Sequence, residues 1–306
     1  MYSTTARLPY GQKVQFSGQN VSTQADNSSA LYLVATPIGN LGDISSRALD
    51  VLQSVNVVAA EDTRHSRHLL QHFAINTRLI AYHEHNEEQQ TPVLLKMLAE
   101  GESIALVSDA GTPLVSDPGY RLVSAALERG VRVIPIPGAC AAIAALSASG
   151  LPTDRFVFEG FLPAKQGARV RHLDSLKDEQ RTLVFYESCH RIVLSLKDMV
   201  SVFGSERQAV LARELTKTFE TIRKYSLGEL ADWVEQDSNQ QKGEIVLLVE
   251  GAETSNEGDA VLLAKLLPAL VKELPVKQAA KIASQVTGVN KNKLYKQALK
   301  LKSNSK

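Results

Sequence analysis

Three loops rich in glycine, proline and small residues follow short apolar runs in the first half of the sequence. Each run has the length and composition of a buried strand, so each loop is expected at a strand's carboxyl end. Glycine lets the backbone approach a ligand closely, and proline fixes loop shape without donating an amide. Three such loops together favour a binding cleft for a flat, extended cofactor over three unrelated tight turns. The loops are Thr36–Asp43, Ser108–Gly119 and Pro135–Ala142.

A cluster of two imidazoles and a carboxylate, His83-Glu84-His85, suggests a metal site at first sight. On a strand the two histidines share a face, but two further ligands do not follow at any recognisable spacing. We therefore expect no metal and interpret this segment as a loop.

Motifs of several common enzyme classes are missing from the sequence. It has no Walker A loop, no G-x-G-x-x-G, no H-E-x-x-H and no G-x-S-x-G. The sequence therefore lacks the motifs that usually support ATP hydrolysis, standard nicotinamide chemistry, zinc proteolysis or serine hydrolysis.

The elements that must position the loops alternate between apolar strands and amphipathic helices. This alternation predicts βαβ units and a mostly parallel sheet covered by helices on both faces. Ligands of such sheets bind beyond the carboxyl ends of the strands, where the three loops lie. The expected strands are 31–35, 55–60, 78–82, 103–107 and 131–136, and the expected helices are 45–54, 87–100 and 120–129.

The pattern changes after residues 150–154, where glycine and proline interrupt the chain. The run 218–225 is β-branched and aromatic and can pair antiparallel, so the second sheet is expected to be mixed. The predicted fold class is α/β, with two α/β domains, a mainly parallel sheet and then a mixed sheet, and a small helical C-terminal appendix. The expected strands of the second domain are 155–161, 182–186, 208–212 and 244–249, with helices near 168–177 and 191–202. The predicted parts are a disordered tail 1–29, an N-terminal domain 30–150, a C-terminal domain 153–251 and a basic helical appendix 259–306, which follows a polar linker 252–258.

Charge is unevenly distributed along the 306 residues. The whole chain has 34 Lys and Arg against 33 Asp and Glu, a formal charge of +1 that names no partner. Residues 272–306 contain nine Lys and one Glu, a local +8, which leaves −7 for the rest. Such an appendix either binds phosphates with low sequence specificity or is a solvated face.

The cysteines and the apolar runs indicate where in the cell the protein is located. Cys140 and Cys189 are too few for a disulfide scaffold and indicate reduced thiols in a cytoplasmic protein. The N-terminal residues lack an apolar leader. The long uncharged run 133–153 is interrupted by prolines and glycines, so we expect a strand, a turn and a buried helix rather than a membrane span.

Four motifs of the first domain resemble those of the tetrapyrrole methylase superfamily, whose members use S-adenosylmethionine. They are Ala35–Leu41, Ala60–Arg64, Val107–Pro113 with Asp117–Gly119, and Pro137–Ala141. The resemblance implies two α/β domains with the methyl donor held between them, largely by backbone atoms. The residues that it places at the donor site are Pro37, Ser108, Asp109, Ala110, Gly111, Thr112, Pro113, Pro137, Gly138 and Ala139, with Ala212 and Glu244 as candidates from the second domain.

Motifs of the second domain narrow the resemblance to the branch that methylates a cytidine ribose 2'-oxygen in bacterial 16S ribosomal RNA. They are Gly160–Pro163, Phe185–Arg191, Arg213–Glu220 and Lys242–Glu244. The match covers residues 31–251, with a weaker match in the basic end. This chain departs from the branch at Ala139, where proline is expected, and at Phe219, where tryptophan is expected.

The implied reaction is displacement of a sulfonium methyl group by a ribose hydroxyl, which requires no metal. A base or cation near the hydroxyl still helps. The candidates are Glu61, Asp62, Glu187, His190, Glu214 and Lys217, of which we favour Glu187, Glu214 and Lys217 as catalytic. Each of these, taken singly, is more often part of a salt bridge or a helix cap. The expected RNA contacts are Arg64, Arg191, Arg213, Lys291 and Lys293.

The resemblance also implies partners: 16S ribosomal RNA in the assembled 30S subunit, and a second copy of the chain in a homodimer. Two other functions share parts of this pattern. Methylation of a tetrapyrrole ring carbon would use the same donor site with a porphyrin-sized acidic substrate. A non-catalytic ribosome-binding or RNA-binding factor would use the basic appendix alone.

Overall fold

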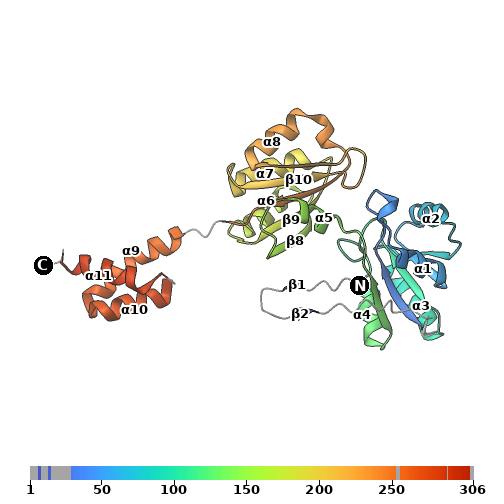
Figure 1. Cartoon of the computed structure of the whole chain (residues 1–306), viewed down its shortest axis with the longest axis horizontal. Helices are drawn as coiled ribbons and strands as arrows, with labels where there is room; N and C mark the ends of the chain where they lie inside the picture. Colours follow the sequence, from blue (N-terminus) through green and yellow to red (C-terminus); the bar gives the residue numbers. More distant parts are fainter. Residues whose placement is uncertain (1–5, 8–12, 15–28, 253–255, 288, 304–306) are drawn as a thin grey trace. The chain divides into compact units, whose positions relative to one another are not determined.

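The computed structural model of the chain describes residues 6–7, 13–14, 29–252, 256–287 and 289–303 (Figure 1). The chain divides into two compact units, Met1–Cys140 and Ala141–Lys306. This division falls ten residues before the domain end predicted at 150, because the helix after the third loop belongs to the second unit.

A five-stranded parallel sheet forms the centre of the first unit, in the order β5-β4-β6-β3-β7. All residues of β4 and β6 are buried, as expected for central strands covered on both faces. The strands are β3 (Ala30–Val34), β4 (Val57–Ala60), β5 (Arg78–Ala81), β6 (Ile104–Val107) and β7 (Arg132–Ile136). The helices are α1 (Ser46–Ser54), α2 (Thr63–His72), α3 (Glu87–Ala99) and α4 (Tyr120–Glu128), and a 3₁₀ turn spans Leu41–Asp43.

Two apolar clusters cover the two faces of this sheet. Alternate residues of a strand point to opposite faces, so Ala59 and Leu106 pack with α3 and α4, whereas Ala60 and Ala105 pack with α1 and α2. Parallel strands end at the same edge, which therefore carries all the loops that follow β3, β4, β6 and β7.

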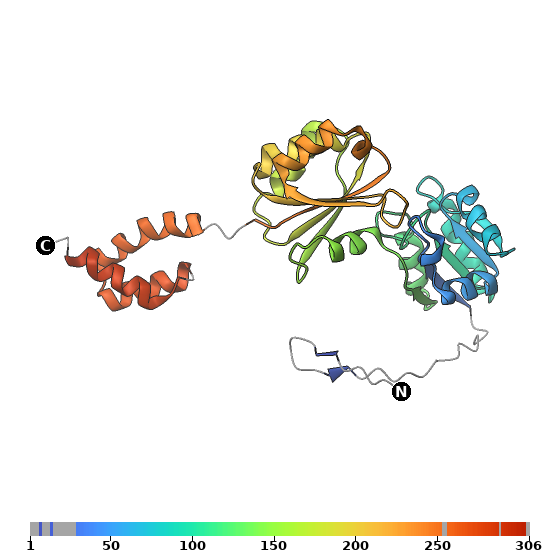
Figure 2. The ribbon, with the colours of Figure 1, turned by 45° about the horizontal axis from the view of Figure 1, so that its top comes forward.

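The second unit contains a mixed sheet in the order β11-β10-β12-β9-β8. Strands β8 and β9 are parallel, and every other neighbouring pair is antiparallel. Helices α6 to α8 pack on one face, and α5 lies against β9 and β12 on the other (Figure 2). The strands are β8 (Phe156–Phe161), β9 (Thr182–Ser188), β10 (Gln208–Arg213), β11 (Thr221–Ser226) and β12 (Glu244–Val249). The helices are α5 (Ala141–Ala148), α6 (Gln166–Ser175), α7 (Ile192–Phe203) and α8 (Leu227–Gln236), with a 3₁₀ turn at Ser238–Gln241.

The last three helices pack around a small core of their own. They are α9 (Asn256–Glu273), α10 (Val276–Thr287) and α11 (Lys291–Ser303). Their core is made mostly of leucine and alanine, including Leu267, Ala283 and Leu294. Helix α9 begins inside the segment predicted as a polar linker, so the helical appendix starts earlier than the expected residue 259.

These observations confirm the predicted α/β class, with a parallel sheet, then a mixed sheet and C-terminal helices. Most predicted strands and helices lie within one or two residues of their observed bounds. The antiparallel run predicted from 218 begins at Thr221, because the preceding residues form a tight loop. Within the expected disordered tail, Ala6–Arg7 (β1) pairs with Lys13–Val14 (β2); the remaining residues up to 28 lie outside the described part of the chain.

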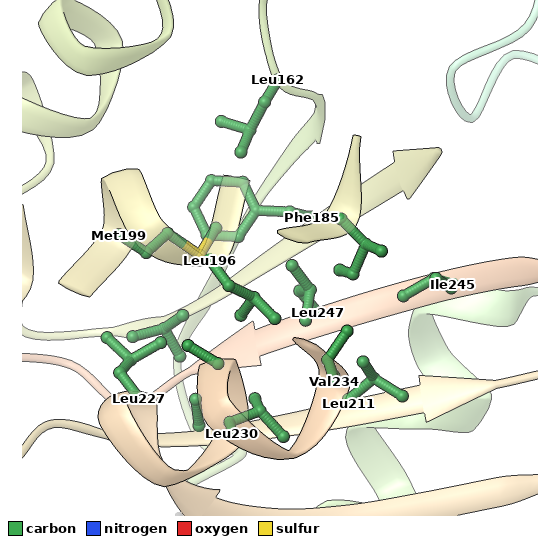
Figure 3. Packing of buried hydrophobic residues seen from close by; sticks show 14 of the residues in the cluster. Leu162, Phe185, Leu196, Met199, Leu211, Leu227, Leu230, Val234, Ile245 and Leu247 are labelled. Carbon is green, nitrogen blue, oxygen red and sulfur yellow. The ribbon is translucent and has the colours of Figure 1, made fainter. Parts of the chain in front are cut away.

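The core of the second unit predicts a large effect for one aromatic truncation. Phe185 is fully buried among leucines of α7, α8 and β10 (Figure 3). Replacing it with alanine is expected to lower the free energy of unfolding by about 3–5 kcal/mol. Trp233, the single tryptophan, packs against the same cluster and reports urea unfolding by its fluorescence.

Leu194→Ala on α7 is the control, because that side chain is 56% exposed. A loss below about 1 kcal/mol for Phe185→Ala would mean that this cluster does not hold the unit together.

Candidate functional site

Backbone hydrogen bonds join the first two predicted loops at the carboxyl edge of the parallel sheet. The amide of Thr36 donates to the carbonyl of Gly111 at 2.9 Å, and the amide of Gly111 donates back at 3.0 Å. The Thr36 hydroxyl donates to the carbonyl of Ser108 at 3.3 Å. The loop after β3 is thereby fixed to the loop after β6, although 72 residues separate Thr36 from Ser108.

The third loop joins the other two through one hydroxyl and one glycine. Thr112 Oγ1 donates to the carbonyl of Ala139 at 3.0 Å. A Cβ atom on Gly138 would lie 2.9 Å from the Cβ of Ala35, so only glycine allows this approach. Gly111 has φ +86°, which a residue with a side chain rarely adopts. The structure thus brings residues of all three loops together, as the sequence predicted.

The ten residues predicted for the donor site differ in exposure. Three of them, Ser108, Gly111 and Pro113, are buried and form the floor of the loops together with the neighbouring Thr36. The exposed positions are Ala110, Pro137 and Gly138, and the half-buried ones are Pro37, Asp109, Thr112 and Ala139. A ligand on this edge would therefore meet mostly small side chains and backbone.

Carboxyl groups gather beside these loops. Asp109 Oδ1 accepts a hydrogen bond from the amide of Asp62 at 3.0 Å. Burial, together with the charge of Asp109, raises the pKa of Asp117 to about 6, although a hydrogen bond from Ser108 opposes the shift. Burial, then the charges of Asp117 and Asp109, also raise the pKa of Glu61. Burial is the larger cause of both raised pKa values, and the neighbouring carboxyl groups add to it. A positively charged ligand would therefore be favoured here.

Asp117 was not among the predicted site residues. Its signal in the sequence is the Asp-Pro-Gly run that precedes α4, but burial and the neighbouring carboxyl groups appear only in the fold. The same loop contains Leu114 at φ +70° and Ser116 at φ +68°, strained conformations for residues with side chains.

Arg64 lies at the start of α2 and is paired with Asp62. Its Nη2 atom is 2.8 Å from Asp62 Oδ2, while its side chain is 87% exposed. A hydrogen bond from Arg64 keeps the pKa of Asp62 well below its usual range. The guanidinium thus retains an exposed surface for a phosphate, whereas the Asp62 carboxylate is engaged as a helix cap.

In the second unit, β8, β9 and β10 end at the edge where β12 begins. Glu187 lies there with a fully buried side chain. Its carboxylate accepts from Ser195 Oγ at 2.5 Å and pairs with Arg191 Nη2 at 2.8 Å. Arg191 also donates to the carbonyl of Leu162 at 3.3 Å. Both charges therefore fix the start of α7 against the ends of β8 and β9.

Lys217 lies between two carboxylates at the same edge. Its Nζ atom is 2.8 Å from Glu214 Oε1 and 3.1 Å from Glu244 Oε2. Burial alone would lower the pKa of Lys217, but the hydrogen bonds to both glutamates outweigh it and raise the pKa. Burial likewise acts to raise the pKa of Glu214, and the bonds from Lys217 and the Glu244 amide lower it below its usual value. At neutral pH the pair is an ammonium beside a carboxylate.

Arg213 is buried, with only 7% of the residue exposed. Its guanidinium donates to Gln240 Oε1 at 3.2 Å, to the carbonyl of Phe219 at 3.0 Å and to Thr221 Oγ1 at 3.3 Å. We therefore give Arg213 a role in holding the loop rather than the phosphate contact expected from the sequence.

The predicted lysines of the appendix, Lys291 and Lys293, are exposed at the start of α11. Residues 274–303 contain seven lysines and no acidic residue. This segment is therefore strongly basic and suits a polyanion.

Within the described ranges, His, Cys, Asp and Glu form no group of three or more arranged to hold a metal ion. His83 and His85, considered above, have ring centroids 6.1 Å apart. Among the same residues, none of the helices has the length and apolar character of a membrane span.

Comparisons with known proteins agree with this geometry. A family model described as tetrapyrrole (corrin/porphyrin) methylases matches residues 30–231. A second model, described as the RsmI C-terminal HTH domain, matches residues 257–302. Ribosomal RNA small subunit methyltransferase I of Escherichia coli O157:H7 is 58% identical over 276 residues, which cover 90% of this chain and 96% of that protein.

Solved structures share the fold at low identity. A diphthine synthase superposes with a TM-score of 0.56 at 17% identity, covering 72% of this chain and 90% of its own. Uroporphyrin-III C-methyltransferase from Thermus thermophilus, complexed with S-adenyl homocysteine, gives 0.50 at 20% identity, covering 72% and 97%.

The raised pKa of Asp117 predicts how the stability of the first unit depends on pH. The folded state binds the Asp117 proton more tightly than the unfolded chain does. The stabilisation of the folded state by this proton is therefore lost as pH rises through about 6. Asp117→Asn cannot ionise. Without ligand, this variant is expected to gain about 1 kcal/mol over wild type at pH 7.5, after allowance for solvent screening, and almost nothing at pH 4.

Scanning calorimetry at the two pH values measures this gain. Asp50→Asn on the exposed face of α1 is the matched control and should show no such difference. An Asp117→Asn variant less stable than wild type at pH 7.5 would contradict the assignment.

Proposed function

Because the chain belongs to the tetrapyrrole (corrin/porphyrin) methylase family, we propose that it transfers a methyl group from S-adenosylmethionine to the 2'-oxygen of a cytidine ribose in 16S ribosomal RNA. The predicted family is confirmed by the family match and the relatives. A solved structure of the same fold that is complexed with S-adenyl homocysteine supports S-adenosylmethionine as the methyl donor. The 58% identity to a ribosomal RNA small subunit methyltransferase favours RNA over a tetrapyrrole ring as the substrate.

One structural observation supports the proposed donor site. Three loops from distant parts of the sequence meet at one sheet edge through Thr36, Gly111 and Thr112. The donor carries a sulfonium and an ammonium group, and the crowded carboxyl groups of Glu61, Asp109 and Asp117 suit these charges. The residues present therefore fit the cofactor. The residues that would hold it are the ten predicted ones and Glu61 and Asp117.

S-adenosylmethionine supplies an activated methyl group together with its own leaving group. The protein then has to orient the ribose hydroxyl and manage its proton. Orientation can contribute roughly 7–11 kcal/mol to such a reaction, and a general base about 10²- to 10⁴-fold in rate. Rigid loops held by backbone hydrogen bonds can provide this orientation.

Of the three predicted catalytic residues, we propose that Glu214 and Lys217 manage the proton of the ribose hydroxyl. Glu214 is ionised at neutral pH and can accept the hydroxyl proton, and Lys217 is protonated and can stabilise the alkoxide that forms. Glu187 has no exposed side-chain atoms and already binds Arg191 and Ser195. We therefore propose that it positions the end of β9 instead.

The remaining partners follow from the same proposal. We propose the 30S subunit as the substrate particle, with Arg64, Arg191, Lys291 and Lys293 as contacts for RNA phosphates. The exposed Arg64 and the basic helix α11 support this. We further propose a homodimer and a cytoplasmic location, in keeping with the family resemblance and the two free thiols.

Methyl transfer to isolated 30S subunits tests the function. The protein is incubated with labelled S-adenosylmethionine and 30S subunits that lack endogenous ribose methylation, and the label is mapped by nuclease digestion and mass spectrometry. We expect label on one cytidine 2'-oxygen. Glu214→Gln should lower kcat about 10²-fold or more, because the amide cannot accept the proton.

The control is Glu235→Gln, which removes the carboxylate of another lysine pair in the same unit, an exposed one with Lys197. Label on a base or on added uroporphyrinogen instead of ribose would overturn the proposed reaction. An unlabelled subunit with intact donor binding would do the same.

A further inference from the structure

Phe219 is the most exposed aromatic side chain of the described second unit. It is 73% exposed, although such rings are usually buried. It belongs to the segment Arg213–Glu220, here called the 213–220 loop, which joins β10 to β11 at the edge where Lys217 lies. A water-exposed phenyl ring at this position calls for an explanation beyond folding.

The backbone beneath this ring is firmly held. The buried guanidinium of Arg213 donates to the carbonyl of Phe219 at 3.0 Å. The amide of Glu220 donates to the carbonyl of Lys217 at 3.1 Å, and the Glu220 carboxylate accepts from the amide of Thr216 at 2.7 Å. The exposed ring is thus presented from a fixed backbone.

The conformation of the loop is also strained. Glu214 has φ +52° and Thr216 has φ +65°, left-handed values that cost free energy in residues with side chains. Such strain persists only where surrounding contacts impose it, and it is concentrated at binding and catalytic sites. Here the bonds from Arg213 and to Glu244 impose it.

Cations lie beside the ring along the chain. Lys217 precedes it by two residues and is protonated. Arg223 and Lys224 follow on the edge strand β11, and both are exposed. Aromatic rings interleaved with cations are the combination that binds single-stranded nucleic acid, because bases stack on the rings while the cations bind the phosphates. An RNA base therefore suits this surface better than an apolar protein partner.

The proposed reaction gives such a ring a specific use. A ribose 2'-hydroxyl must reach the catalytic groups, and RNA is recognised in a sequence-specific way mainly where its bases are unpaired and stacked on protein rings. A ring on the same loop as Glu214 and Lys217 can replace the stacking that the nucleotide loses.

We propose that Phe219 stacks on an unpaired base of the substrate RNA and so holds the methylated nucleotide, or its neighbour, beside the 213–220 loop. This inference rests on the proposed function and adds a stacking residue to it. Arg213 acts as its positioning residue, because it fixes the carbonyl of Phe219 without touching RNA.

Kinetics with 30S subunits separate this role from a structural one. Phe219→Ala is expected to raise KM for the subunit about tenfold or more, the usual effect of losing one base-stacking contact. The affinity for S-adenosylhomocysteine should stay unchanged, and kcat should change much less than KM. Phe219→Trp should restore a KM near that of wild type. Phe156→Ala is the matched control. Phe156 is an exposed phenyl ring at the start of β8, so it lies at the opposite end of the strands from Lys217.

A direct optical readout accompanies the kinetics. In a Trp233→Phe background, Phe219→Trp provides the single tryptophan of the chain. We expect its fluorescence to be quenched by a single-stranded RNA oligonucleotide with the target sequence, and to be far less affected by the same RNA in a duplex.

Three outcomes would overturn the inference: an unchanged KM for Phe219→Ala, no rescue by Phe219→Trp, or a change in oligomeric state on light scattering, which would make Phe219 a subunit contact. A wild-type protein that labels no RNA would instead contradict the proposed function, while the fluorescence titration would still decide whether Phe219 stacks on a base.

Discussion

The pair of backbone hydrogen bonds between Thr36 and Gly111 is the contact on which the rest of the first unit's site depends. It joins the loop after β3 to the loop after β6, and Gly138 then approaches Ala35 from the loop after β7. A side chain at Gly138 would force the backbone away from Ala35, and a side chain at Gly111 would be strained at φ +86°. The loops therefore have their shape before any ligand binds, and the free energy of binding is not spent on ordering them.

The second unit uses charge in two distinct ways at its sheet edge. The buried carboxylate of Glu187 is paired with Arg191, and removing one partner of such a pair leaves an uncompensated charge. The buried guanidinium of Arg213 is engaged with carbonyl and hydroxyl oxygens. They set the positions of α7 and of the 213–220 loop. The partly exposed Glu214 and Lys217 are held by short contacts but keep a surface toward solvent. Because Glu214 and Lys217 are accessible and the supporting charges are not, Glu214 and Lys217 are the candidates for catalysis.

Much of this arrangement is predictable from the sequence, and the rest depends on tertiary contacts. Continuous apolar runs predicted the parallel sheet, and the glycine and proline loops were correctly expected to meet at one of its edges. Helix α8 was missed, although Ser226 and Glu229 form a capping box that can be found in the sequence. The burial of Arg213 and Glu187 could not be read from the sequence, because long-range contacts decide which charges are exposed. The crowding of Glu61, Asp109 and Asp117 likewise arises only when separate loops meet.

Calorimetric titration with S-adenosylhomocysteine tests most directly whether the three loops hold the methyl donor through close backbone approach. Gly138→Ala places a Cβ atom 2.9 Å from the Cβ of Ala35 and should weaken binding at least tenfold. Gly167→Ala, whose Cβ would make only an ordinary contact on α6, should bind as wild type does. Wild-type affinity in Gly138→Ala, with the fold intact, would contradict the account.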